Sequence, residues 1–498
     1  MKKKQAFLKG LLVVFLIAAV CLPVEVRAEE IVLVAAEKVG MASTSNFADY
    51  HMPIASSDDK VFIGYCVGTQ GDAQTEVAMR TAPGEWSYAI VDEYTTLDNT
   101  HNVPSLIVDG HGYLHVAFDM HNSSWGYKVS LSPNTIEDGF GEENSNPSLP
   151  EGRNTYPRFW RDEKGKIYLT WRRKAPPASV TPSRYAKSIN FGVYDPTIGI
   201  WETVTDLAYE DPHTDGEWVL GKAGVGIGGD GRVHLAFVWT PGLGGTWKGQ
   251  DLTYAYTDDN GKTWHKTDGS VYNLPITRDQ ADIIVSGNPD IRTQQYVLVD
   301  PENRPHIIFF DGNLNHIVLE NGRWSTPQVV AMNTGGIDAG IDPSGILTVV
   351  TEREGKVYRS YDGGKTWRSF VLERPVDDGS YSNNIRIDQW WLKKTGRLRI
   401  YNMRKIRLSD TEFLFPIWFF EYRFTDGGEP SSTPTPTPAC DKTGDVDCDG
   451  AVDSRDILLA LKAWLTEGTL DNNYREDVNG DGKVNGVDFA WVMRGYGN

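Results

Sequence analysis

Two histidine-asparagine pairs enclose one short stretch of the sequence, and their side chains could do acid-base chemistry. His101-Asn102 precedes an apolar run, a DGHG turn and a second apolar run, and His121-Asn122 follows them. This pattern predicts a β-hairpin, which returns the chain to the sheet edge where it began. We therefore expect the two histidines to lie close together. Imidazoles titrate near neutral pH, so such a pair could move a proton or bind an anion.

The next segment repeats this offset with other side chains. Tyr156 lies at the start of a second predicted hairpin, in NTYPRFW, and Arg172 and Arg173 lie at its end, in YLTWRRK. Because strand side chains alternate between faces, only one of the two arginines should point inward, and we favour Arg172. His51 and Lys222 occupy comparable positions in other units. A site lined by His, Tyr and Arg suits an anionic sugar such as a uronate.

These hairpins belong to a repeat that runs through most of the chain. Each unit is a strand, a tight turn that is usually rich in Asp and Gly, and a second strand, as is typical of propeller blades. The seven recurring second strands begin at Val61, Tyr113, Ile167, Val233, His306, Ile346 and Arg397. We predict an all-β, seven-bladed β-propeller over residues 30–426. The innermost strands of a propeller all run the same way, so their starts gather at one mouth of the channel.

Two segments support this fold. Thr257–Trp264 and Ser360–Trp367 match the Asp-box pattern S/T-x-D-x-G-x-T-W, which resembles the bacterial neuraminidase repeats (BNR) of sialidase-like propellers. In such a turn the Asp accepts backbone hydrogen bonds, the Gly relieves strain and the Trp fills space between strands. We expect the Asp boxes to be structural rather than catalytic.

The C-terminal tail carries two copies of a calcium-loop pattern, DVDCDGAVDSRD from Asp445 and DVNGDGKVNGVD from Asp477. Each copy has oxygen ligands at loop positions 1, 3, 5, 9 and 12 and Gly at position 6, which is the EF-hand order with Asp replacing Glu at position 12. We predict two calcium ions. The expected ligands are Asp445, Asp447, Asp449, the Ala451 carbonyl, Asp453 and Asp456, and then Asp477, Asn479, Asp481, the Lys483 carbonyl, Asn485 and Asp488.

This duplicated loop-helix pattern resembles a type I dockerin, a small α-helical module, over residues 440–498. The resemblance implies that the tail binds a cohesin domain of a cellulosome scaffold. A Pro/Thr-rich linker at residues 427–439 separates the tail from the body, because such a repeat cannot pack a core.

The N-terminal residues 1–28 have the pattern of a secretory signal peptide. Three lysines precede an apolar run from Leu11 to Leu22, and a small-residue cleavage site follows at Val26–Ala28. We therefore expect a secreted, extracellular protein that is attached to a cellulosome or cell surface through a scaffold. The net charge of −18 argues against nucleic-acid and membrane partners. Outside the signal peptide, Cys440 and Cys448 are close enough to pair, which would leave Cys66 as a buried thiol.

The body also resembles a family of BNR propellers that includes ulvan-lyase-like and rhamnosyl-glucuronate-cleaving enzymes, through HNVPSL, FDMHN, TYPRFW and TWRRK. The resemblance implies β-elimination next to a uronate carboxylate. It makes His101 and Tyr156 the base and acid, Arg172 the clamp on the carboxylate, and His121 a second neutralising or positioning group. We predict a polysaccharide lyase that acts on an acidic polysaccharide, such as one built from rhamnose and glucuronate.

Two other functions stay open at this point. A glycoside hydrolase of the sialidase-like fold would need two carboxylates, and the spacing selects no pair. The acidic candidates are Asp119, Glu210, Asp211, Glu217 and Asp338. A non-catalytic carbohydrate-binding component would instead present exposed aromatic side chains to the sugar. The candidates for that role are Trp125, Trp239 and Trp247.

Overall fold

The computed structural model describes the body of the chain with short gaps. The described residues are 30–43, 51–58, 60–69, 72–95, 101–142, 153–175, 186–209, 217–219, 222–241, 248–287, 291–292, 295–332, 334, 336–352, 355–374, 381–409 and 413–425. Contacts group Glu30–Phe424 into one compact unit. The predicted signal peptide, linker, dockerin, calcium ligands and Cys440–Cys448 pair all lie outside the described residues.

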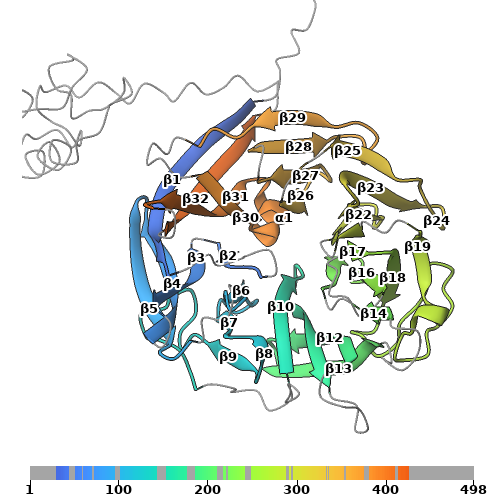
Figure 1. The fold of residues 1–498 in the computed structure, drawn as a ribbon, viewed down its shortest axis with the longest axis horizontal. Helices are drawn as coiled ribbons and strands as arrows, with labels where there is room; N and C mark the ends of the chain where they lie inside the picture. The colour runs from blue at the N-terminus through green and yellow to red at the C-terminus, as the bar shows by residue number, and fades with distance from the viewer. Residues whose placement is uncertain are drawn as a thin grey trace, which may run out of the picture. The chain divides into compact units, whose positions relative to one another are not determined.

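The unit Glu30–Phe424 is a ring of β-sheets around a central channel (Figure 1). Within the described residues seven sheets form the ring, so the predicted all-β seven-bladed propeller is confirmed. Blade 1 contains β2 (Ile54–Ser56), β3 (Val61–Thr69), β4 (Asp72–Ala82) and β5 (Glu85–Asp92). Blade 2 contains β6 (Ser105–Val108), β7 (Leu114–Phe118) and β9 (Gly126–Val129). Blade 3 contains β10 (Arg153–Arg161), β11 (Ile167–Ala175), β12 (Ala186–Asp195) and β13 (Ile200–Tyr209), and β8 (His121–Ser123) pairs with β10.

The remaining blades follow the same order from the channel outward. Blade 4 contains β15 (Gly224–Ile227), β16 (Val233–Pro241), β18 (Asp251–Thr257) and β19 (Asp282–Val285), with β14 (Glu217–Val219) also on β16. Blade 5 contains β21 (Gln295–Val299), β22 (Pro305–Phe310) and β23 (Asn313–Glu320), with β24 (Arg323–Trp324) and β25 (Gln328–Met332) on β23. Blade 6 contains β26 (Ile337–Ile341), β27 (Leu347–Thr351), β28 (Lys356–Ser360) and β29 (Arg368–Val371). A two-stranded sheet of β17 (Lys248–Gly249) and β20 (Ile291–Arg292) and the 3-10 turn η2 (Arg278–Gln280) lie outside this order.

Blade 7 joins the two ends of the propeller. It contains β30 (Tyr381–Ile387), β31 (Leu398–Arg407) and β32 (Phe413–Thr425), and β1 (Glu30–Ala42) pairs with β32 as its outermost strand. The first and last strands of the body therefore hydrogen-bond within one sheet, and this pairing closes the ring.

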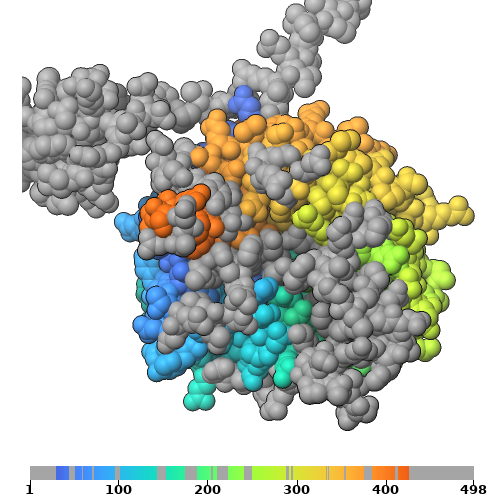
Figure 2. Space-filling view, viewed as in Figure 1, coloured from blue at the N-terminus to red at the C-terminus, as the bar shows by residue number. Residues whose placement is uncertain are grey.

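The core lies between the blades, because each sheet packs against both neighbours. One apolar cluster joins blades 1 and 2 through side chains such as Phe62 and Val116, and another joins blades 3 and 4 through side chains such as Phe191 and Leu235. Burial on both faces explains why β22, with the sequence PHIIFF, is buried at every position. Figure 2 shows the orange segments of the later blades packed against the yellow ones at the upper right of the ring.

The Asp-rich turns end the innermost strands. Asp109 Oδ1 accepts hydrogen bonds from the backbone N–H groups of His111 (2.8 Å) and Tyr113 (2.9 Å), and Asp342 does the same for Ser344 (2.9 Å) and Ile346 (3.0 Å). These turns lie at the mouth of the channel opposite to the strand starts, because all innermost strands run in one direction. This arrangement leaves the other mouth to the residues that precede the strands.

Both Asp boxes are structural, as predicted. In the first box, Asp259 accepts hydrogen bonds from the backbone and side chain of Thr263 (2.8 and 2.7 Å), and Trp264 Nε1 donates to the Gly261 carbonyl (3.0 Å). Gly261 has φ +90°, a conformation that residues with a Cβ rarely adopt. Trp264 is fully buried and packs edge-to-face against Phe191.

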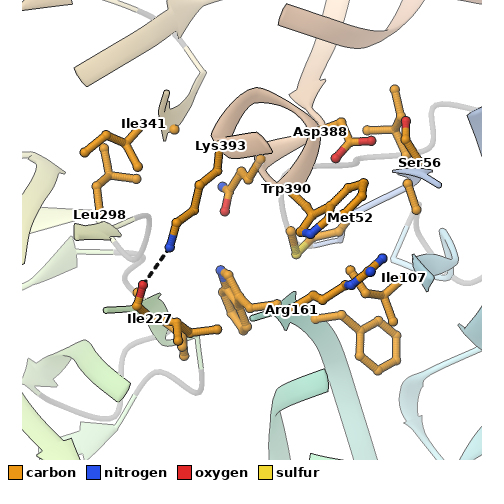
Figure 3. Close-up of a pocket in the computed structure, with 18 of the residues that line it drawn as sticks. Met52, Ser56, Ile107, Arg161, Ile227, Leu298, Ile341, Asp388, Trp390 and Lys393 are labelled. Atoms are coloured by element: carbon orange, nitrogen blue, oxygen red, sulfur yellow. Dashed lines mark hydrogen bonds between the residues drawn. The ribbon is translucent and has the colours of Figure 1, made fainter. Parts of the chain in front are cut away.

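A short helix that we did not predict follows β30. It lies at the same mouth of the channel as the Asp-rich turns. α1 (Gln389–Thr395) begins with Asp388, whose carboxylate accepts from the Trp391 N–H (2.9 Å), and ends at Gly396 with φ 71°. Figure 3 shows its Lys393, whose Nζ donates to the Ile227 carbonyl of blade 4 at 2.8 Å. The helix borders a cavity of about 70 Å³ that is lined by residues from the innermost strands.

No helix in the described part of the chain is long and apolar enough to span a membrane.

Several histidines are buried within blades and have structural partners. His115 contacts the Tyr127 hydroxyl, His234 Nδ1 lies 2.6 Å from the Tyr254 hydroxyl, and His306 Nδ1 lies 2.9 Å from His316 Nε2. Burial lowers the pKa of His234 to about 3 and that of His316 to about 3. Cys66 is also buried, as expected, and burial raises the pKa of its thiol to about 12.

These histidines predict a loss of stability in acid. In the unfolded chain, His234 and His316 bind protons below about pH 6.5. In the folded protein, the buried rings bind protons only near about pH 3. Each ring should therefore lower the free energy of unfolding by at most about 1.4 kcal/mol per pH unit in this window. Denaturant unfolding between about pH 7 and about pH 4 measures this slope. Above the window, the contribution of these two rings to the free energy of unfolding should not change with pH. His316→Gln should reduce the slope, whereas the exposed control His111→Gln should not, and equal slopes would contradict this account.

Candidate active site

The four predicted site residues, His101, His121, Tyr156 and Arg172, come together at the mouth where the innermost strands start. The rings of His101 and His121 stack with centroids 4.4 Å apart. The Tyr156 ring lies 5.8 Å from that of His101 and 6.3 Å from that of His121. The Arg172 guanidinium carbon lies 4.5 Å from the centroid of the Tyr156 ring. Tyr156 is therefore the common neighbour of the other three.

An irregular stretch of backbone aims Tyr156 at the channel. Its φ is +59°, and the pairing of β10 with β11 shifts register between Thr155 and Arg158. A positive φ is rare for a bulky residue, and a bulge of this kind re-aims a side chain. Asp119 and Asn122 also have positive φ, at 49° and 59°. Such strain is often found at functional sites, and these three residues lie at the two hairpin ends.

The asparagines of the two His-Asn pairs hold these loops in place. Asn102 Nδ2 donates to the Asp119 carboxylate, across the base of the hairpin. The Asn122 N–H donates to Thr155 Oγ1 at 2.9 Å, and its side-chain oxygen accepts from Arg172 at 3.4 Å. The repeated pair thus combines a ring that faces the mouth with an amide that fixes the loop.

Arg172 points into the site, and Arg173 does not. Arg172 is only 6% exposed, and burial lowers its pKa while contact with Tyr156 opposes that change. Arg173 is directed to Asp206, at 3.6 Å. The two side chains therefore point to opposite sides, as expected for adjacent residues of a strand, and the inward one is Arg172, the arginine that we favoured.

His51 and Lys222 complete the surroundings of Tyr156. The His51 ring, from the segment before β2, meets the Tyr156 ring edge-on at 6.0 Å. Burial, together with the nearby charges of His101 and Arg386, lowers the pKa of His51 to about 3, so this ring is neutral near pH 7. Lys222, from the segment before β15, has Nζ 5.5 Å from the Tyr156 ring centroid. Residues from blades 1, 2, 3 and 4 therefore meet at one ring.

The sequence analysis did not predict that two further arginines of the propeller would be buried. Arg158 of β10 and Arg386 of β30 are both buried, and Arg158 Nη1 donates to the Ala223 carbonyl at 3.3 Å. Burial raises the pKa of Asp338, while these two arginines lower it. In the sequence, each of these arginines is a charged residue flanked by apolar residues. Strand alternation alone does not show where in the ring such a residue lies.

The carboxylates considered for hydrolysis do not form a pair within the described residues. Asp338 accepts hydrogen bonds from the Ile387 N–H (2.9 Å) and Gln389 Nε2 (3.1 Å), and Asp119 contacts Asn102. Glu210 and Asp211 lie outside the described residues, and so does the side chain of Glu217.

The proposed sugar-stacking role of Trp125 and Trp239 is wrong. They are 4% and 1% exposed, and Trp239 Nε1 donates to Thr253 Oγ1 at 2.7 Å. Both rings fill space in the blades, where a sugar could not reach them, and Trp247 lies outside the described residues. Among the residues that the structure describes, no group of three or more His, Cys, Asp and Glu side chains is arranged to hold a metal ion.

Comparison with known proteins supports the propeller fold and identifies the C-terminal domain. Residues 443–495 match the dockerin type I domain. An ulvan lyase of Nonlabens ulvanivorans is 26% identical over an alignment of 316 residues that covers 55% of this chain and 63% of the relative. The chain thus spans less than two thirds of the length of that relative.

Solved structures resemble the propeller at low sequence identity. The polysaccharide lyase Uly1 superposes with a TM-score of 0.59 at 14% identity, over 80% of this chain and 99% of that one. An ulvan lyase of family PL25 gives 0.56 at 14% identity, over 78% of this chain and 95% of that one. At this identity the likeness shows the fold. The model of the BNR repeat-containing family matches residues 60–332, more than half of the sequence, and the chain therefore belongs to that family.

Proposed function

We propose that the protein is a polysaccharide lyase that cleaves an acidic, uronate-containing polysaccharide by β-elimination. One observation carries the proposal: His101 and Tyr156, whose side chains are able to give and take protons, lie beside the buried cation Arg172 at one mouth of the propeller. The similarity to an ulvan lyase supports the same reaction class.

The chemistry of elimination explains why these side chains belong together. The C5–H bond of a uronate breaks as a base takes the proton, the C4–O bond breaks as the leaving oxygen gains a proton, and a C4–C5 double bond forms. The C5 proton is only weakly acidic, and a cation on the carboxylate stabilises the enediolate-like intermediate. Arg172 can hold a carboxylate with two parallel hydrogen bonds. His101 and Tyr156 can serve as base and acid, with His121 as a neutralising or positioning group.

The rival functions receive less support from the described residues. A hydrolase requires two free carboxylates across the bond, whereas Asp119 and Asp338 are engaged in hydrogen bonds within the fold. A binding module requires exposed aromatic faces, whereas Trp125 and Trp239 are buried. Neither rival explains the cations gathered around Tyr156.

For the substrate, we propose a polysaccharide of glucuronate and rhamnose. An ulvan lyase of similar fold, with a TM-score of 0.53, has been solved bound to -[GlcA(1-4)Rha3S]-. The matched positions HNVPSL and TYPRFW in this chain support an equivalent use of its mouth.

For the tail, we propose a calcium-loaded dockerin that attaches the secreted enzyme to a cohesin of a cellulosome scaffold. The family match at residues 443–495 supports this role, and dockerins of type I generally bind calcium. The two loops supply hard oxygen ligands in EF-hand order, which suits two calcium ions.

The reaction type can be tested with the full chain and a set of uronate-containing glycans. We expect the ultraviolet absorbance of an unsaturated uronate to rise together with new reducing ends. His101→Ala should lower kcat by about 100-fold or more, because it removes an acid-base group, without a large change in unfolding temperature. His111→Ala, at an exposed turn, is the matched control. New reducing ends without the absorbance would instead establish hydrolysis, and glycan binding without either signal would establish a binding module.

Arg172 should not tolerate lysine. Arg172→Lys keeps the charge but loses the planar fork, so kcat/KM on a uronate glycan should fall by about 100-fold, whereas Arg173→Lys should change it by less than about threefold. Steady-state kinetics of both variants provide the comparison. Similar losses in the two would show that the carboxylate clamp is not Arg172.

The tail should bind two calcium ions through its two loops. Calorimetric titration of the full chain with calcium should give two sites, and Asp449→Ala with Asp481→Ala should remove both because each change deletes a loop ligand. Capture by type I cohesins should be lost in the same variant, while propeller activity persists. Two retained calcium sites would refute this ligand assignment.

A further inference from the structure

Two cations flank the ring of Tyr156, and the proposed reaction uses only one of them. Arg172 lies over the ring at 4.5 Å and Lys222 at 5.5 Å. They come from different blades, since Arg172 is in β11 of blade 3 and Lys222 precedes β15 of blade 4. The clamp on the substrate carboxylate accounts for Arg172 and leaves Lys222 without a role.

The fold holds Lys222 firmly at this position. Gln295 of blade 5 is fully buried, and its Nε2 donates to the carbonyls of Lys222 (2.6 Å) and Ala236 (3.0 Å). From the opposite side, Arg158 of blade 3 donates to the carbonyl of Ala223 at 3.3 Å. The Lys222 side chain is itself only 6% exposed. Burying an ammonium group costs free energy unless a partner stabilises its charge, and the ring of Tyr156 is one such partner.

We propose that Lys222 is a positioning residue that stabilises the phenolate form of Tyr156 during the reaction. This inference rests on the proposed function. Tyr156 carries a negative charge in either acid-base role: before it takes the C5 proton as base, or after it gives its proton to the leaving oxygen as acid. Once the substrate carboxylate has engaged Arg172, Lys222 remains to balance that charge.

The other groups around Tyr156 do not replace Lys222. His51 is neutral because burial lowers its pKa to about 3, so it contributes no positive charge at the pH of a working enzyme. His101 and His121 stack on each other and face the ring of Tyr156 from the side of blade 2. A lysine suits this role because its compact point charge needs no bidentate partner.

Direct titration of Tyr156 tests the proposal without any turnover. The tyrosinate absorbance of the wild-type protein minus that of Tyr156→Phe isolates this ring, and the same subtraction is made in the Lys222→Met and Lys222→Arg backgrounds. Burial raises the pKa of other tyrosines such as Tyr127 and Tyr254, so they ionise at a higher pH. We expect the Tyr156 signal to move up by about one pH unit or more in Lys222→Met and to stay near the wild-type position in Lys222→Arg.

Kinetics on a uronate glycan separate this role from simple substrate binding. Lys222→Met should lower kcat by about 10-fold or more with KM changed by less than about threefold, and Lys222→Arg should recover most of it. An unmoved Tyr156 titration, or a higher KM at unchanged kcat, would overturn the proposal. If Lys222→Met fails to fold, Lys222→Gln provides the same comparison. Absence of lyase product from every protein, wild type included, would refute the proposed reaction, whereas the titration would still decide what Lys222 does to Tyr156.

Discussion

The pairing of β1 with β32 is the constraint on which the rest of the structure depends. A sheet radiating from a channel has two faces to bury, and only a closed ring gives every blade a neighbour on both sides. The strand Glu30–Ala42 supplies the outer edge of the last blade, so the beginning and end of the body are held together by one hydrogen-bonded sheet. Closure also creates the channel mouth, because it brings the starts of all the innermost strands to one place.

The mouth has a charge opposite to that of the whole protein. The chain carries a net charge of −18, yet the side chains around Tyr156 are two cations and three histidines. Burial of cations is costly, and it lowers the pKa of Arg172 and of the deeper Arg158. A site that keeps them in spite of this cost is suited to an anion, which would provide the missing counter-charge.

Strain and support are combined in the loops that carry the site. Tyr156, Asp119 and Asn122 all have positive φ, and hydrogen bonds from neighbouring segments hold two of them, through Asn102 and Thr155. Such bonds let a few residues keep an unfavourable backbone that points a side chain at the channel. The opposite mouth is different, since α1 borders a cavity there, Lys393 donates to the Ile227 carbonyl, and the Asp side chains of the turns accept backbone hydrogen bonds.

The sequence by itself determined the repeat and the hairpin end at which each site residue lies. The seven second strands, the Asp boxes and the opposite directions of Arg172 and Arg173 all follow from period-two alternation and turn chemistry, which are local properties. The meeting of His101 with His121 was also predictable, because a hairpin returns to its starting edge. These inferences needed only one hairpin at a time.

Only the tertiary structure decided which blades contribute to the site and which aromatic side chains are buried. His51 and Lys222 are separated from Tyr156 by long stretches of sequence, and they meet it only because the ring closes. The local sequence leaves open whether Trp125 and Trp239 are exposed or buried, and packing within and between the blades buried them. Helix α1 is too short to give a clear periodicity, and its contacts across the channel hold it in place. Local pattern specifies the strands and their faces, whereas contacts between distant segments specify the site.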